Sequence, residues 1–206
     1  MTCETTSSIL PNESLDSTRT TPFARAFSFV GDSGVGKTTL LVSVVAALRA
    51  AGAKVAVVKH SQHFDDTDPP GKDSARLRAA GASRVVLASP ERTLVFWDHA
   101  GASPSFADHL ALAGAADLVL VESYASAGLP AIEVLRAALP RREARLRADP
   151  RWIGLASDFD PQAVPASVRR FSLEAAAEIA RFLLQRAQGS TDPNDAARPP
   201  LGSPSP

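Results

Sequence analysis

One stretch decides the fold of this chain: Gly31-Asp32-Ser33-Gly34-Val35-Gly36-Lys37-Thr38. It matches the spacing G-x-x-x-x-G-K-[ST] in full. Glycine allows tight turns that point successive backbone N–H groups inward, where they can bind phosphate oxygens. The lysine adds a mobile positive charge for the outer phosphates, and the threonine hydroxyl suits Mg²⁺. The stretch therefore predicts a phosphate-binding loop; the alternative is a glycine-rich turn that happens to precede a helix.

The flanks of the loop are those that this motif requires. Residues 26–30 form a short apolar run typical of a buried strand. Residues 36–51 follow with leucine and valine at helical spacing, Gly52 is a stop signal, and residues 54–58 predict the next strand. A strand, a helix and a strand within about 35 residues predict a βαβ unit with parallel strands. The positive end of the helix dipole then lies at the bound phosphates.

Apolar runs and helical patterns alternate along the rest of the chain. Further strands are expected at residues 84–88, 92–97, 118–121, 132–135 and 152–156, and further helices at 73–80, 106–113 and 173–186. Ser89-Pro90-Glu91 predicts a hairpin between the first two of these strands, and Asp73 is the expected N-cap of its helix. The predicted fold class is α/β, similar to P-loop NTPases, with a mostly parallel central sheet flanked by helices.

Composition and charge set the organisation and exclude some functions. The 206 residues carry 22 Lys plus Arg against 22 Asp plus Glu, so a broadly basic nucleic-acid binder is not expected. The sequence shows neither an apolar run of about 18 residues nor a secretion signal, and its single cysteine, Cys3, fits a reducing cytoplasm. Polar tails are predicted to be disordered at residues 1–22 and 189–206, around one nucleotide-binding domain at 23–188.

Phosphoryl chemistry also needs a carboxylate near the Mg²⁺ ion, usually at the end of a neighbouring apolar strand. The run Asp117-Leu-Val-Leu-Val-Glu122 offers one at each end. Glu122 lies at the carboxyl end, where ligands of parallel sheets bind, and is the predicted metal-side carboxylate. The alternative is a solvated strand-end residue. Asp117 is expected to cap or pair at the far edge.

A polar, proline-rich segment at residues 59–74 leaves the same edge of the sheet. A long loop at this place suits a lid or switch over a phosphate site. We expect Asp66 and Asp68 to approach Mg²⁺ directly or through water, and Lys59, His60, His63 and Lys72 to bind a second anionic ligand. A solvated acidic loop is the open alternative, and the zinc signal is weak.

The sequence has no Asn-Lys-x-Asp or Thr-Lys-x-Asp box to recognise guanine. Ala156-Ser157-Asp158 follows a late strand and can substitute, with the Asp158 carboxylate accepting from guanine N1 and N2. An Asx turn that ends the strand is the other reading of these residues.

Three blocks of the sequence resemble the family of molybdopterin-guanine dinucleotide biosynthesis adaptor proteins, MobB. They are GDSGVGKTTL, KHSQHFDDTDPPGKDSARLRAAGA, and DLVLVES followed by LPAIEVLR, and the likeness spans about residues 26–158. The middle block discriminates, because phosphate-binding loops alone occur across many unrelated activities. The family has His-Asp-Phe-Asp where this chain reads His63-Phe64-Asp65-Asp66, and it usually has lysines where this chain holds 123–127 and Ala131.

The resemblance implies a GTP-binding protein, typically a homodimer with weak Mg²⁺-dependent GTP hydrolysis. It would act with a guanylyltransferase, MobA, that attaches GMP to molybdopterin; whether molybdopterin itself binds is left open. The predicted catalytic residues are Lys37, Asp66 and Glu122, and the predicted metal residues Thr38, Asp66 and Glu122. The predicted ligand contacts are Gly31, Ser33, Gly34, Val35, Gly36, Lys37, Thr38, Thr39, His60, Asp68, Lys72, Asp73 and Asp158.

Two rival functions stay open. Four arginines between Arg141 and Arg147 resemble the arginine lid of a P-loop small-molecule kinase, although a solvated helical face explains them as well. The other rival is a nucleotide-dependent switch or chaperone for another metalloenzyme pathway, in which segment 59–72 sets partner affinity. Phosphate transfer to an added small acceptor separates a kinase from an adaptor.

Overall fold

The structure, a computed structural model, describes residues 25–61, 71–99, 103–139, 149–162 and 164–189. Several residues singled out in the sequence lie outside these ranges. They are His63, Asp66, Asp68, the arginines from Arg141 to Arg147, and nearly all of both predicted tails.

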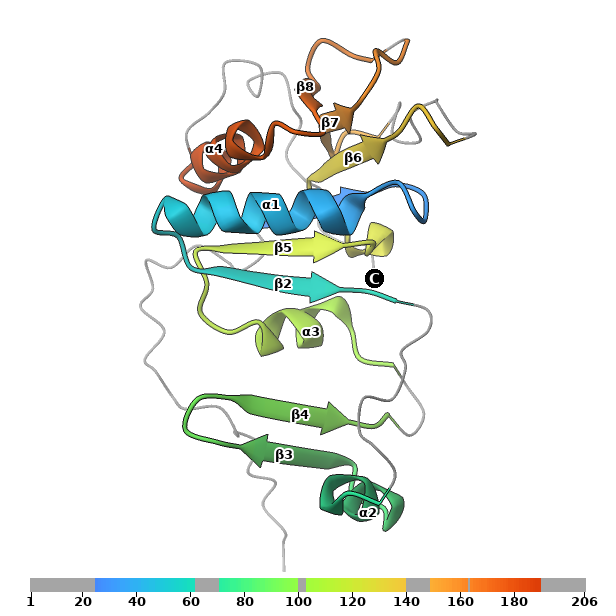
Figure 1. Ribbon diagram of the computed structural model, residues 1–206, viewed down its shortest axis with the longest axis vertical. Helices are drawn as coiled ribbons and strands as arrows, with labels where there is room; N and C mark the ends of the chain where they lie inside the picture. The colour runs from blue at the N-terminus through green and yellow to red at the C-terminus, as the bar shows by residue number, and fades with distance from the viewer. Residues whose placement is uncertain (1–24, 62–70, 100–102, 140–148, 163, 190–206) are drawn as a thin grey trace, which may run out of the picture.

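Within the described residues, six strands form a sheet in the order β2-β5-β1-β6-β7-β8 (Figure 1). Each pairing in this sheet is parallel. The central strands are continuous apolar runs because both of their faces are covered. The predicted α/β fold with a mostly parallel sheet is confirmed. The strands are β1 Ala26–Val30, β2 Val55–Lys59, β5 Leu118–Glu122, β6 Ala131–Leu135, β7 Trp152–Ser157 and β8 Arg169–Ser172.

Helices cover the two faces of the sheet unequally. α1 (Lys37–Ala50) and α4 (Ala176–Ala187) lie side by side on one face, where Val44 and Leu48 join the same apolar core as Ile179 (Figure 1). α3 (Phe106–Leu112) packs on the other face. The main core therefore lies directly beneath α1, the helix that begins at the phosphate-binding loop.

A separate hairpin forms one end of the molecule together with α2 (Asp73–Ala79) (Figure 1). β3 (Arg84–Ala88) and β4 (Thr93–Trp97) pair antiparallel, as predicted from Ser89-Pro90-Glu91. Ser89 closes the turn, because its backbone N–H donates to the Arg92 carbonyl oxygen at 2.8 Å.

Apart from shifts of about one residue at the ends of other elements, the described structure differs from the sequence predictions in β8, α2 and α4. β8 was not predicted, because only Phe171 of its four residues is buried and an edge strand gives little apolar signal. The N-cap of α2 is Lys72, not Asp73, which is the first helical residue. α4 begins at Ala176 instead of residue 173, because Ser172 starts a turn closed by the Ala175 N–H at 3.1 Å.

Helix α3 has the capping that its sequence allows. The Ser105 hydroxyl accepts from the Asp108 backbone N–H, and the Asp108 carboxylate accepts from the Ser105 backbone N–H, which together form a capping box. The hydrogen bonds from Ser105 hold the pKa of Asp108 below its usual value. No helix in the described ranges combines the length and apolar content needed to cross a membrane.

Candidate phosphate-binding site

The glycines of the loop between β1 and α1 are required by close contacts and backbone conformation. A Cβ atom on Gly31 would lie 2.5 Å from the backbone oxygen of Val134 on β6, so this position excludes every side chain. Gly36, with φ of 96°, directly precedes α1 in the left-handed region that favours glycine. The loop therefore lies tightly against β6 before the helix begins.

The first turn of α1 provides backbone donors and contains no acidic residue of its own. Its N-cap, Gly36, has no side chain to satisfy the first N–H groups, and no acidic residue lies in the first turn. The first N–H groups of a helix have no partner within the helix, and together with the dipole of this 14-residue helix they attract an anion.

Lys37 lies across the loop. Its side chain is buried at 7% exposure, and Nζ donates to the carbonyl oxygens of Gly31 at 3.1 Å and Asp32 at 2.7 Å. These bonds hold the ammonium group over the beginning of the loop. This is where the outer phosphates of a nucleotide need a positive charge.

Thr38 and Glu122 meet although 84 residues separate them in sequence. The Thr38 hydroxyl donates to Glu122 Oε1 at 2.6 Å, and Lys59 Nζ lies 3.5 Å from Glu122 Oε2. The parallel register of Phe29 with Glu122 places this carboxylate at the carboxyl end of the sheet. With 6% exposure, Glu122 is not a solvated strand-end residue. Its hard oxygen atoms, with the threonine hydroxyl, fit Mg²⁺.

The remaining loop residues divide by exposure. The Val35 side chain is buried in the core, so only its backbone is available to a ligand. Ser33 and Thr39 are exposed at the loop and in the first turn of α1.

His60 is at the same edge of the sheet and contacts the strand that carries Glu122. Its backbone N–H donates to the Glu122 carbonyl oxygen at 3.0 Å, and its ring lies 4.7 Å from the Tyr124 ring between centroids. The Tyr124 hydroxyl lies 3.4 Å from His109 Nδ1 on α3. Sequence analysis missed Tyr124, which contacts both His60 and His109 beside β5, the strand that ends at Glu122.

Lys72 and Asp73 are not brought to the phosphate loop. Both are exposed at the start of α2, at the far end of the molecule from the loop (Figure 1). Asp73 pairs instead with Arg76 at 3.5 Å. Their assignment as ligand contacts stays a prediction.

Asp158 and Glu174 lie in a second hollow at the same edge of the sheet. The pocket measures about 640 Å³ and lies at the carboxyl ends of β7 and β8. Asp158 Oδ1 accepts from the Ala137 backbone N–H at 2.7 Å, so this oxygen binds a distant loop and does not form an Asx turn. Both carboxylates are exposed. Hydrogen bonding to Ser172, helped by the charge of Arg136, lowers the pKa of Glu174, which is therefore ionised at neutral pH.

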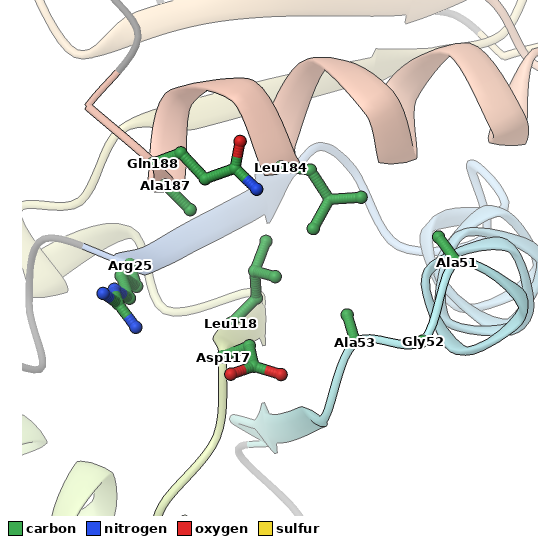
Figure 2. Close-up of a pocket in the computed structure, with 9 residues that line it drawn as sticks. All are labelled: Arg25, Ala51, Gly52, Ala53, Asp117, Leu118, Leu184, Ala187 and Gln188. Atoms are coloured by element: carbon green, nitrogen blue, oxygen red, sulfur yellow. The ribbon is translucent and has the colours of Figure 1, made fainter.

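A smaller pocket, of about 290 Å³, lies at the opposite, amino-end edge of the sheet (Figure 2). Arg25 and Asp117 line it, and Asp117 Oδ2 accepts from the Lys54 backbone N–H at 2.7 Å. Asp117 thus pairs at the far edge, as expected. This pocket is remote from the phosphate loop and contributes nothing to it.

Sequence analysis also missed Arg136, directly after β6. Its Nε donates to the Val35 carbonyl oxygen at 3.2 Å, across 101 residues of sequence. In the parts of the chain that the structure covers, no group of three or more His, Cys, Asp or Glu side chains could hold a metal ion by itself.

Comparisons with known proteins agree with this geometry. The family model described as "Molybdopterin guanine dinucleotide synthesis protein B" matches residues 26–158. The molybdopterin-guanine dinucleotide biosynthesis adapter protein of Escherichia coli is 35% identical over 134 residues, which cover 64% of this chain and 77% of that protein. The protein of the same name from Haemophilus influenzae is 41% identical over 105 residues, 50% of this chain and 58% of that one.

Solved structures support the fold alone. The MobB homolog of Bacillus stearothermophilus has a TM-score of 0.57 at 22% identity, over 80% of this chain and 99% of that one. MobB of Bacillus subtilis has a TM-score of 0.58 at 17% identity, over 79% and 97% of the two chains.

Proposed function

The chain belongs to the molybdopterin guanine dinucleotide synthesis protein B (MobB) family, and on this premise we propose that it is a GTP-binding adaptor in molybdenum cofactor biosynthesis. The observation that carries the proposal is the contact of Thr38 with Glu122 at the mouth of the phosphate loop. It brings the hydroxyl and the carboxylate that a nucleotide-bound Mg²⁺ ion requires to one point, beside Lys37.

Each group of this site has a separate task. The loop amides and the start of α1 bind phosphate oxygens, and Lys37 moves from its carbonyl partners to the outer phosphates. Mg²⁺, when bound, neutralises phosphate charge, and Thr38 with Glu122 would hold it, together with Asp66 as proposed from the sequence. Lys59, next to Glu122, limits the excess negative charge of the carboxylate.

Hydrolysis is expected to be slow. Glu122 is hydrogen-bonded to Thr38 and paired with Lys59, so among the described residues near the loop the main carboxylate is poorly placed to take a proton from water. Slow hydrolysis is compatible with a role as adaptor, set by the nucleotide state, which the family match supports. GTP hydrolysis measured with and without the guanylyltransferase tests this role. Slow turnover by the chain without its partner supports an adaptor, whereas fast turnover without the partner indicates a stand-alone GTPase.

Guanine selection is assigned to Asp158. One carboxylate oxygen binds Ala137, and the other can accept from guanine N1–H and N2–H, two donors that adenine does not present in this arrangement. Asp158→Asn should weaken GTP binding about tenfold or more and improve xanthosine triphosphate binding, because an amide can donate to the extra xanthine oxygen. Asp160→Asn is the matched control, since Asp160 lines the same pocket but pairs with Arg170. Unchanged preference in Asp158→Asn contradicts the assignment.

A homodimer and a guanylyltransferase partner, MobA, belong to the same proposal. Support for the dimer comes from the hairpin, where Val86 and Val95 pair across the strands at 60% and 43% exposure. A two-stranded hairpin with exposed apolar pairs needs a partner surface for stability. Sedimentation of Val95→Lys should give monomers, and Leu112→Lys, exposed elsewhere at 59%, should not. A dimer unaffected by Val95→Lys excludes the hairpin as the interface.

The proposal also places the protein in the cytoplasm and leaves molybdopterin as a second ligand to be tested. The single cysteine, Cys3, is consistent with action in the cytoplasm. Direct binding of molybdopterin is tested separately, by titrating the cofactor into the GTP-bound protein.

A further inference from the structure

Arg136 lies where the sheet meets the phosphate loop. β6 is the neighbour of β1, with Val30 in register with Glu133, so residue 136 extends beyond the sheet edge beside the loop. From there, Nε donates to the Val35 carbonyl oxygen at 3.2 Å. This hydrogen bond holds Val35, within the loop, from a residue outside the motif.

The end of the guanidinium lies against Gly36. A Cβ atom added there would be 3.0 Å from Arg136 Nη2, so the group lies on the bare backbone at the mouth of α1. Arginine has five N–H donors and stays charged at all ordinary pH values. Its hydrogen bond to Val35 uses one of these donors, and the side chain is half-buried.

Arg136 also lies near the proposed base pocket. The next residue, Ala137, donates its backbone N–H to Asp158 Oδ1 at 2.7 Å. Arg136 is also close enough to Glu174, at the rim of that pocket, to help lower the pKa of its carboxyl. Arg136 therefore lies between contacts with the phosphate loop, through Val35 and Gly36, and a chain neighbour that contacts Asp158.

We propose that Arg136 is a further nucleotide-binding residue, which clamps the loop through Val35 and donates from its Nη atoms to the phosphate nearest the nucleoside. This inference rests on the proposed GTP binding. A guanidinium next to Gly36 can form charge-assisted hydrogen bonds with phosphate oxygens, which are about twice as strong as neutral ones. Because every guanine nucleotide carries that phosphate, Arg136 contributes equally to the binding of GTP and GDP.

The experiment compares GTP and GDP affinities, measured by calorimetry on the full chain, for the wild type, Arg136→Met and Lys37→Ala. Arg136→Met should weaken both ligands by the same factor, about tenfold to a hundredfold, whereas Lys37→Ala should weaken GTP more than GDP. Arg136→Lys keeps the charge and should recover part of the affinity. If Arg136→Met does not fold, the comparison is made with Arg136→Lys, which should bind both nucleotides more weakly than the wild type. Arg49→Met, exposed in the last turn of α1, is the control and should bind as the wild type does.

The outcomes separate the two proposals. Wild-type affinities in Arg136→Met and Arg136→Lys, or a loss confined to GTP, overturn the assignment of Arg136 and leave GTP binding intact. A wild-type protein that binds neither GTP nor GDP overturns the proposed function itself.

Discussion

The replacement of Lys37 by alanine separates binding from folding. In the structure, Nζ donates to the carbonyl oxygens of Gly31 and Asp32, and in the complex it is expected to donate to phosphate oxygens. Hydrogen bonds to charged groups contribute about 1.5–3 kcal/mol each, so two such bonds correspond to about 10²–10⁴-fold in GTP affinity. The two bonds to the loop carbonyls also involve the ammonium charge, but their loss is offset in part because the variant no longer buries that charge. The cost to the fold is therefore expected to stay below the typical stability of about 5–15 kcal/mol. Lys37→Ala should therefore weaken GTP binding by about 10²–10⁴-fold and remain folded.

The assay combines GTP titration with a thermal melt of the same preparation. Lys54→Ala is the control, because Lys54 is an exposed lysine at the opposite edge of the sheet. Unaltered GTP affinity in Lys37→Ala refutes the placement of the phosphate site, and loss of the cooperative melt refutes the separation of binding from folding.

Three further predictions concern the loop, the metal side and helix α3. Gly31→Ala should destabilise the fold by about 2–4 kcal/mol in chemical denaturation, because its Cβ would lie 2.5 Å from the Val134 oxygen; a wild-type midpoint contradicts this. Glu122→Gln should remove the Mg²⁺ dependence of GTP affinity, because the glutamine amide can still accept from Thr38 but carries no negative charge for the ion. A GTP affinity that still depends on Mg²⁺ in this variant contradicts the assignment of Glu122 to the metal. Folding lowers the pKa of Asp108, so the ionised carboxylate stabilises α3 above about pH 4, and this stabilisation is lost as the pH falls through the folded pKa. The ellipticity measured during an acid titration should show this step in the wild type. The step should be absent in Asp108→Asn.

Local signals in the sequence predicted the elements around the candidate site well. The glycine spacing, the apolar run before it and the helical pattern after it specify β1, the loop and α1 together. Glu122 was predicted because a carboxylate after a fully apolar strand reaches the ligand edge of any parallel sheet. Its contact with Thr38 follows from the topology.

Contacts between distant segments could not be predicted in this way. Arg136 follows an apolar strand like many other arginines, and only the packing of β6 beside β1 brings it to Val35. Lys72 and Asp73 were grouped with the loop because their segment leaves the ligand edge, but the chain carries them to the hairpin end of the molecule (Figure 1). No pattern of sequence spacing records the direction in which a long loop runs.

The titration of this chain with GTP and with ATP, each with Mg²⁺, measures nucleotide binding and base selection together. GTP should bind at one site per chain, with an affinity about tenfold or more above that of ATP, since the phosphate loop holds both and Asp158 favours guanine. Equal binding of the two nucleotides would contradict guanine selection, and no heat of binding from either would contradict the phosphate site.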